Sequence, residues 1–175
     1  FAQADLRRNE QIQAAIGDSG FDLVTAIDVL YHFVDRDDFR SALANLAQRV
    51  RPGGWLLLSD VFVENEKQIA RHVVRRPLST YDELLRPMGF VQRGREPVFA
   101  LLGDPVPRPG HPTDFLLYNG WRVFARALRS TPAPLRDAMG ALGVRLLAPA
   151  DAALRWAGIA RGTNLELGIF QRRST

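Results

Sequence analysis

The chain has 175 residues, 46% of them hydrophobic, which is enough for one substantial core and short for two. It contains no cysteine, which excludes disulfides, thiolate metal sites and cysteine nucleophiles, and which fits the reducing cytoplasm where we expect the protein to reside. The formal net charge of +4 does not indicate nucleic-acid binding, because 23 basic residues are interleaved with 19 acidic ones and form no stripe with regularly spaced aromatics.

No apolar run approaches the roughly 20 residues of a membrane span, so we predict no transmembrane segment. At the start of the chain, Phe1–Leu6 alternates like the end of a strand. Asn9–Ile16 is a short helix candidate that ends at Gly17. Phe21–Ile27 is an apolar run with β-branched residues, which is typical of a strand buried on both faces.

A helix over Asp35–Arg51 and a second strand follow, and Asp35 is placed to cap the helix. The apolar residues of this helix form one stripe at helical spacing: Phe39, Leu43, Leu46, Ala47 and Val50. Residues 52–54, Pro-Gly-Gly, end the helix and turn the chain into the buried strand Trp55–Ser59. Strand, helix and strand in this order predict a right-handed parallel unit whose two strands are neighbours.

The next segment predicts two helices and a strand. Glu64–Val74 has apolar residues on one side of a helix. Ser79–Asp82 has the pattern of a capping box, and the helix that it opens stops at Gly89. Phe90–Leu102 is predicted to be a strand.

The last third of the chain predicts a group of helices and a final strand. Gly103–Pro112 is rich in proline and glycine and makes a rigid connection. Three helices follow, one around Trp121, one around Met139 and one over Ala150–Ala157. The Trp121 helix has arginines opposite its apolar stripe, so it is a lid or dimer face, a helix resting on a membrane surface, or an ordinary helix packed over the sheet. Thr163–Arg173 alternates like a strand.

A family resemblance rests on several of these segments together. FDLVTAIDVLYHF…ALANLAQRVRPGGWLLLSD resembles the fourth strand, the following helix and the fifth strand of class I S-adenosylmethionine-dependent methyltransferases. FAQADLR is similar to the segment before them, and STYDELLRPMGF to the family's last helix. The resemblance implies an α/β Rossmann-like fold: a mostly parallel sheet with flanking helices, an antiparallel last strand and a helical insertion before it. Residues 1–112 would form the core, 113–161 the insertion or lid, and 162–175 the last strand returning to the core.

The resemblance implies a site for S-adenosylmethionine at the carboxyl ends of the strands. Asp5 would accept a hydrogen bond from the adenine amino group, and the N–H of Leu6 would reach a ring nitrogen. Ala26, Ile27 and Asp28 would lie against the methionine part and the adenine. From the residues alone, Asp5 is also interpretable as a loop acid that caps the following segment, and Asp28 as a cap of the turn after its strand.

On the acceptor side, His32 is either a base that removes a proton from the acceptor or a histidine that shapes the pocket. Tyr31, Asp60 and Trp121 are the residues that we expect to bind the acceptor substrate. No H-E-x-x-H or similar spacing occurs, so we predict no metal site. His72, Arg75 and Arg76 are candidates to face a carboxylate or phosphate on the substrate, but we predict that they are solvated side chains.

The sequence contains no G-x-G-x-x-G, the loop that approaches the cofactor in this family. The resemblance therefore implies the C-terminal part of a methyltransferase, inactive alone, that acts on a small-molecule acceptor. Phe21–Ile27 would then be an open sheet edge, which a homodimer or another partner covers. The alternative is a non-catalytic, methyltransferase-like scaffold or partner subunit that does not bind cofactor alone. A nicotinamide-dependent Rossmann enzyme is a weaker alternative.

Overall fold

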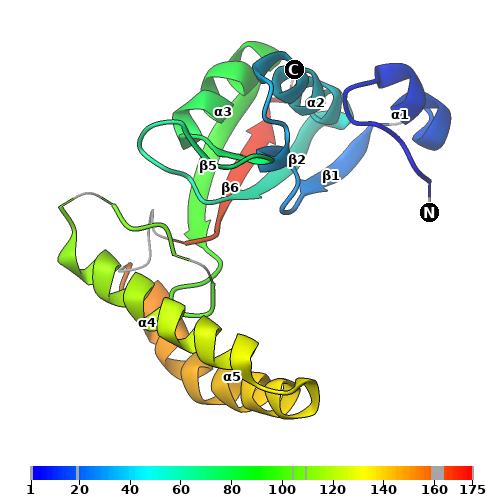
Figure 1. Cartoon of the computed structure of the whole chain (residues 1–175). Coiled ribbons are helices and arrows are strands. Elements are labelled where there is room, and N and C mark those ends of the chain that lie inside the picture. Colours follow the sequence, from blue (N-terminus) through cyan, green and yellow to red (C-terminus); the bar gives the residue numbers. More distant parts are fainter. Residues whose placement is uncertain (1, 19, 104, 109, 159–163, 175) are drawn as a thin grey trace. The chain divides into compact units, whose positions relative to one another are not determined.

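A computed structural model describes the chain except for residues 1, 19, 104, 109, 159–163 and 175 (Figure 1). The chain divides into two compact units. The first, which we call the sheet unit, comprises Phe1–Glu96 and Leu167–Thr175. The second, the helical unit, comprises Pro97–Glu166. The predicted boundaries at 112 and 161 enclose a shorter helical segment than this second unit.

The sheet unit is built on a four-stranded sheet in the order β1-β2-β6-β5. The strands are β1 (Phe21–Ala26), β2 (Val50–Asp60), β6 (Glu166–Arg172) and β5 (Phe90–Pro97). β1 and β2 are parallel neighbours, and β6 runs opposite to β5 beside it (Figure 1). The α/β Rossmann-like fold, the parallel pair and the antiparallel last strand are therefore confirmed.

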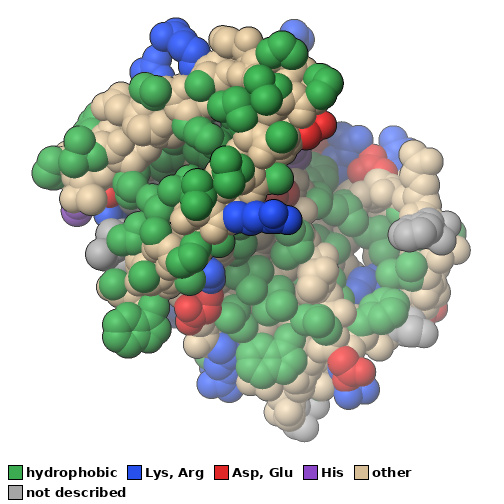
Figure 2. Space-filling view, turned by 90° about the horizontal axis from the view of Figure 1, so that it is seen from below, with side chains coloured by type: hydrophobic (Ala, Val, Ile, Leu, Met, Phe, Trp, Pro, Cys, Tyr) green, Lys and Arg blue, Asp and Glu red, His purple; other side chains and the backbone are tan. Residues whose placement is uncertain are grey.

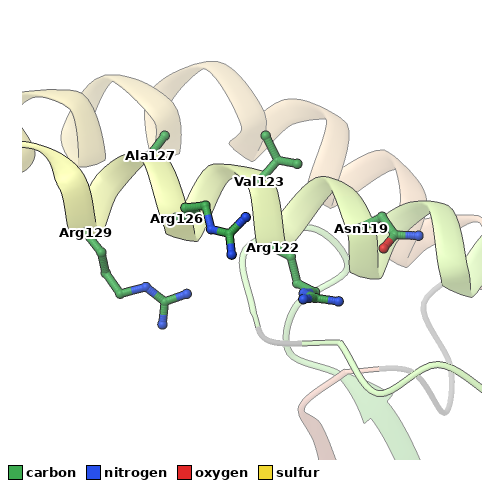
Figure 3. A pocket seen from close by; sticks show the side chains of 6 residues that line it. All are labelled: Asn119, Arg122, Val123, Arg126, Ala127 and Arg129. Carbon is green, nitrogen blue, oxygen red and sulfur yellow. The ribbon is translucent and has the colours of Figure 1, made fainter.

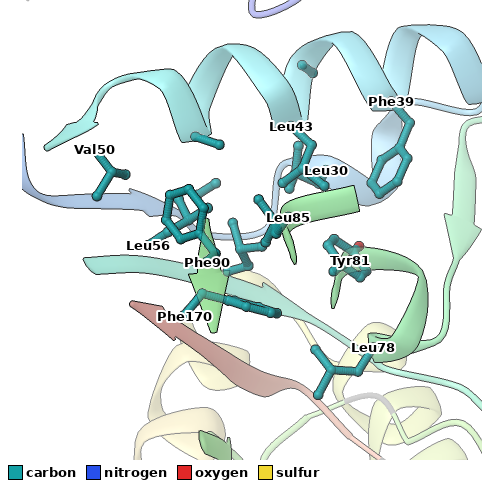
Figure 4. Packing of buried hydrophobic residues seen from close by; sticks show 14 of the residues in the cluster. Leu30, Phe39, Leu43, Val50, Leu56, Leu78, Tyr81, Leu85, Phe90 and Phe170 are labelled. Carbon is teal, nitrogen blue, oxygen red and sulfur yellow. The ribbon is translucent and has the colours of Figure 1, made fainter. Parts of the chain in front are cut away.

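One face of the sheet carries the core, which helices α2 (Arg36–Gln48) and α3 (Leu78–Leu85) cover (Figure 4). Large side chains from both helices and from three strands meet there, among them Phe39, Leu43, Leu56, Tyr81, Phe90 and Phe170. β1 was expected to be buried on both faces, yet Ala26 is its only buried residue. Leu23 of β1 and Trp55, its partner on β2, are both exposed. The sheet is therefore covered on one side at this edge.

Helix α2 begins as predicted, because the Asp35 carboxylate accepts hydrogen bonds from the backbone N–H groups of Asp37 and Asp38 at 2.8 and 3.0 Å. It ends at Gln48 and not at Arg51, since Val50 already pairs with β1. The Pro-Gly-Gly segment lies inside β2 as an irregularity in the register, and Gly53 takes a φ of +81° that suits glycine.

Two other predictions for the sheet unit were wrong. The segment expected as the helix Glu64–Val74 is a hairpin of β3 (Lys67–Ala70) and β4 (Val73–Arg75). Its β-branched residues favour strands, and the Gln68 side chain donates to two carbonyls near the turn. In the described part of Phe1–Leu6 there is no strand, and the short helix α1 (Asn9–Ile16) follows as predicted.

Helix α3 starts at Leu78 after Pro77, with no side-chain cap, so the capping-box prediction was wrong and Ser79 lies in the first turn. A 3-10 turn, η2 (Arg86–Met88), continues α3 and ends at Gly89, whose φ is +86°. β5 then stops at Pro97, well before Leu102.

The helical unit is a hairpin of two long helices, α4 (Pro112–Ser130) and α5 (Ala133–Trp156). The second and third predicted helices are thus one, and α5 runs through Pro149. The carbonyl that Pro149 deprives of a hydrogen bond belongs to Arg145, an exposed residue, so water can replace the bond. The helices approach closely at Gly143, where a Cβ would lie 3.2 Å from the Phe124 ring.

Candidate functional site

A pair of polar residues joins the carboxyl ends of β1 and β2. The backbone N–H of Asp28 donates to the Ser59 hydroxyl at 2.8 Å, and this hydroxyl donates to the Asp28 carboxylate at 3.2 Å. Asp28 has a φ of +55°, a conformation that aspartate adopts more readily than most residues. The chain is thereby turned sharply at the edge where open α/β sheets bind ligands.

An aromatic group lies on the short 3-10 helix η1 (Leu30–His32) that follows Asp28. The Tyr31 and His32 rings have centroids 4.3 Å apart, and the His32 ring stacks on His72 of the hairpin at 5.7 Å. His32 Nδ1 lies 3.1 Å from the carbonyl oxygen of His72. A carbonyl can only accept, so Nδ1 carries the proton and Nε2 of the neutral ring keeps a basic lone pair.

Arg75 connects this aromatic group to a buried carboxylate. Its guanidinium lies 4.2 Å from the centre of the Tyr31 ring, and its Nη1 donates to Asp60 at 2.7 Å. Burial raises the pKa of Tyr31, the negative charge of Asp28 adds to this, and Arg75 opposes it. Through its contacts with Tyr31 and Asp60, Arg75 links the hairpin to the ends of both parallel strands.

Asp60 itself is fully buried. Its oxygens accept from the Tyr81 hydroxyl, from Arg75 and from the N–H of Val61, each at 2.7 Å. Burial raises the pKa of Asp60, while the Tyr81 hydrogen bond and the charge of Arg75 pull it down. Asp60 therefore holds Arg75 and Tyr81 in place, and Arg75 is the member of this group that reaches the site.

The prediction that His72, Arg75 and Arg76 are solvated was wrong for both arginines. Arg76 is 1% exposed, its guanidinium lies 4.1 Å from the Phe39 ring, and it donates to the carbonyl of Phe33 at 2.8 Å. It thus ties the hairpin to the segment after η1. Ser59 and Tyr81 were missed as site residues, and the position of Ser59 beside Asp60 at a strand end was the one local signal.

The predicted cofactor residues lie at different places in the sheet unit. Asp5 forms an ion pair with Arg7 at 2.7 Å and accepts from the Arg7 backbone N–H at 3.0 Å. The Arg7 side-chain hydrogen bond is the main reason that the pKa of Asp5 falls to about 2. The carbonyl of Leu6 accepts from Asn45 at 2.8 Å. Ala26 is buried, while Ile27 is half exposed.

A hollow of about 300 Å³ separates the N-terminal segment from β1. Its walls are mostly apolar and include Leu6, Ile16, Phe21 and Leu23. The last three of these are among the exposed large hydrophobic residues of the chain. The open edge of β1 is thus bordered by apolar surface.

Trp121, the remaining predicted acceptor residue, belongs to the helical unit. It lines an apolar pocket of about 270 Å³ with Leu117, Phe124 and Leu147. Within the described ranges, no group of three or more histidine or acidic residues is arranged to hold a metal ion. Among all the helices that the structure describes, none has the length and hydropathy of a membrane-spanning segment.

Comparison with protein families gives one match, over residues 2–93, to a family described as a methyltransferase domain. This covers slightly more than half of the chain. No curated protein sequence matches. Among solved structures, an O-methyltransferase family protein from Burkholderia thailandensis has 14% identity and a TM-score of 0.49, with 99% of this chain covering 36% of that one.

Two further solved structures are similar at the same level. One is the 1,6-didemethyltoxoflavin-N1-methyltransferase of Burkholderia thailandensis with bound 1,6-didemethyltoxoflavin and S-adenosylhomocysteine (16% identity, TM-score 0.44, 93% of this chain, 48% of that one). The other is the O-methyltransferase of a trans-AT PKS multienzyme from Brevibacillus brevis with S-adenosylhomocysteine (13% identity, TM-score 0.47, 89% and 45%). The present chain thus spans less than half of the length of each of the three proteins.

Proposed function

We propose, because the chain belongs to the methyltransferase domain family, that it is part of an enzyme that transfers the methyl group of S-adenosylmethionine to a small-molecule acceptor. The observation that carries the proposal is the meeting of Asp28 and Ser59 at the carboxyl ends of two parallel neighbouring strands. This is the position at which α/β sheets of this class bind their ligands.

On the cofactor side we assign Asp5 and Leu6 to the adenine, and Ala26, Ile27 and Asp28 to the methionine part and the adenine. Arg7 already makes four hydrogen bonds to the Asp5 carboxylate, about as many as it can accept, so the adenine amino group would have to displace one of them. The Asp28 carboxylate accepts one hydrogen bond, from the Ser59 hydroxyl to Oδ1, so Oδ2 can accept a hydrogen bond from a ligand.

On the acceptor side we assign His32 as the base and Tyr31 and Trp121 as binding residues, with Asp60 acting through Arg75. S-adenosylmethionine held there would supply an activated methyl group, which the acceptor nucleophile would attack in line while the carbon–sulfur bond breaks. His32 Nε2 would take the proton released by an acceptor hydroxyl or amine. The remaining work of the protein is to hold the two reactants aligned.

We further propose that another strand pairs with β1 in the working enzyme and that the present chain alone is inactive. The support is that β1 is the end strand of the sheet and that apolar residues border its free edge. The strand can come from additional polypeptide or from a partner, including a second copy.

A calorimetric titration with S-adenosylmethionine tests the proposal, on this chain and on the same chain extended at its N-terminus by its genomic reading frame. We expect binding by the longer form, and we expect Asp28→Ala to weaken it by about tenfold or more, the usual loss for a hydrogen bond to a charged group. Asp37→Ala, on the exposed surface of α2, is the matched control.

Binding by neither form, with both folded by circular dichroism, would favour the alternative of a non-catalytic scaffold or partner subunit. The Asp5–Arg7 ion pair supports the scaffold alternative, because it gives the Asp5 carboxylate a hydrogen-bonded partner without any ligand.

A further inference from the structure

The helical unit has an apolar face that its two helices do not use against each other. Leu116 and Val123 of α4 are 74% and 71% exposed. On α5, the aliphatic side chains of Leu135, Leu142 and Leu146 are each more than half exposed. We call these five residues the apolar face. Seen from below, hydrophobic side chains gather along both helices of this unit (Figure 2).

Helical spacing places the five residues on one side of the hairpin. The contact between the helices runs through Phe124 of α4 and Gly143 of α5. Leu116 and Val123, seven residues apart, lie about a quarter of a turn round α4 from this contact. The leucines of α5 lie about a quarter of a turn from Gly143, in the same rotational sense along their helix. Because the two helices are antiparallel, both sets of side chains therefore point to the same side of the hairpin.

Arginines border the apolar face and carboxylates do not. Arg126 of α4 and Arg145 of α5 are exposed at its two edges, and neither forms an ion pair with another described residue. The acidic residues of the two helices lie elsewhere: Asp114 pairs with Arg108, and Asp151 pairs with Arg155.

The third acid, Asp137, is on the far side of α5 from the leucines, because two residues correspond to more than half a turn. Figure 3 shows that the guanidinium groups of Arg122 and Arg129 point away from the side of α4 on which Val123 and Ala127 lie. The charge that adjoins the apolar face is therefore positive.

We propose that this face rests on the surface of a membrane that contains anionic phospholipids. The aliphatic side chains would enter the boundary between headgroups and acyl chains, and the arginines at the edges would reach lipid phosphates. Trp156 is 92% exposed at the end of α5, and an exposed tryptophan suits the membrane–water interface. This inference is independent of the methyltransferase proposal.

Two other occupants fit the face less well. A second copy of the chain would bring arginines against arginines with no carboxylate on the face to pair with them. Single-stranded nucleic acid is bound through aromatic side chains on which bases stack, whereas the large residues of this face are aliphatic.

Vesicle sedimentation with the 175-residue chain tests the proposal. We expect the chain to sediment with phosphatidylcholine vesicles that contain about one-third phosphatidylglycerol, and far less with pure phosphatidylcholine, since each basic residue near the surface adds about a fivefold gain in binding. The double variant Leu142→Gln/Leu146→Gln should lower the partition constant at least about tenfold.

The arginines supply the matched controls. Arg145→Gln should lower partitioning about fivefold, while Arg122→Gln, which removes the same charge from a position that points away, should change it about twofold or less. Circular dichroism checks that each variant keeps its helix content.

The proposal is overturned if anionic vesicles do not bind the chain or if the two leucine substitutions leave binding unchanged. It is also overturned if light scattering shows a dimer that these substitutions dissociate, or if single-stranded RNA binds the same face in preference to vesicles.

Discussion

At the scale of single residues, the buried carboxylate of Asp60 is the most demanding group of the sheet unit. It is fully buried, and a buried charge is costly unless donors surround it. Tyr81, also fully buried, supplies one donor and packs edge-on against Phe39 and Phe62 at 5.2 and 5.4 Å between ring centroids. Its hydroxyl thus lies in a place where no water can replace it.

We predict that Tyr81→Phe destabilises the sheet unit by about 1.5–3 kcal/mol, the usual cost of removing a hydrogen bond to a charged group. Because the Tyr81 hydrogen bond lowers the pKa of Asp60, the same change should raise that pKa further. Urea unfolding followed by circular dichroism measures the loss. Tyr118→Phe in α4, whose hydroxyl has no hydrogen bond among the described residues, is the control and should be near neutral.

His32 allows a test that needs no substrate. The His72 carbonyl fixes the proton on Nδ1 of the neutral ring. Long-range proton–nitrogen correlation spectra of the neutral form should therefore show a protonated Nδ1 and a bare Nε2 for His32. The opposite tautomer would remove the lone pair that the proposed base requires.

At the scale of elements, the start of α2 depends on Asp35. The N–H groups of Asp38 and Asp37 hold the pKa of Asp35 below its ordinary value of 3.8. A carboxyl group whose pKa is lower in the folded state stabilises the fold above its unfolded pKa, and this contribution disappears as the pH falls through the folded value. Asp35→Ala should accordingly lower the thermal midpoint near neutral pH.

The difference in thermal midpoint between Asp35→Ala and the unmodified chain should shrink below about pH 4, where the Asp35 carboxylate takes up its proton. Asp35→Asn, which keeps a capping side chain that does not titrate, should lose less than the alanine variant. A difference that stays constant down to pH 2 would contradict this account of the cap.

Two glycines of α5 make a matched pair of predictions. A Cβ at Gly140 meets nothing within 4 Å, so Gly140→Ala should stabilise the helical unit by about 0.5–1 kcal/mol. At Gly143 the same Cβ lies 3.2 Å from the Phe124 ring, which must move. Gly143→Ala should gain less than Gly140→Ala or lose stability, and thermal unfolding of the two variants side by side decides this.

The features of these elements that the sequence predicted correctly are mainly those that depend on residues close together in the chain. The Asp35 cap, the end of α1 at Gly17 and the end at Gly89 of the turn that continues α3 depend on neighbours in the sequence, and they were confirmed. The parallel pair was confirmed as well, because a strand, a helix and a strand in succession restrict how the chain can return to the sheet. The hairpin over residues 67–75 was mistaken for a helix because its apolar spacing fits both. A separate helix was predicted over Ala150–Ala157, whereas α5 runs through Pro149, where the carbonyl that loses its hydrogen bond belongs to the exposed residue Arg145.

The candidate site was harder to predict than the fold. Asp60, Arg75 and Tyr81 come from a strand, a hairpin and a helix, and only the fold brings them together. The sequence picked out Asp28, Tyr31 and His32 because one loop holds all three. Their roles toward a ligand remain predictions.

At the scale of the whole molecule, β1 is the end strand of the sheet, and no other strand of the described residues pairs with its outer edge. Leu23 is 51% exposed on this end strand. We predict concentration-dependent self-association that Leu23→Lys reduces, since an edge lysine blocks strand pairing. Light scattering measures the association. Ile69→Lys, at a similarly exposed position of the hairpin, should leave it unchanged.

Arg75 makes the segment that carries Tyr31 and the β3–β4 hairpin mechanically dependent on each other. The Arg75 guanidinium lies between the Tyr31 ring and the Asp60 carboxylate, which is buried away from solvent. A movement of Arg75 with Tyr31 would therefore leave Asp60 without its ion-pair partner. A molecule that binds against Tyr31 should therefore either slow hydrogen exchange in residues 67–75 or break the ion pair between Arg75 and Asp60.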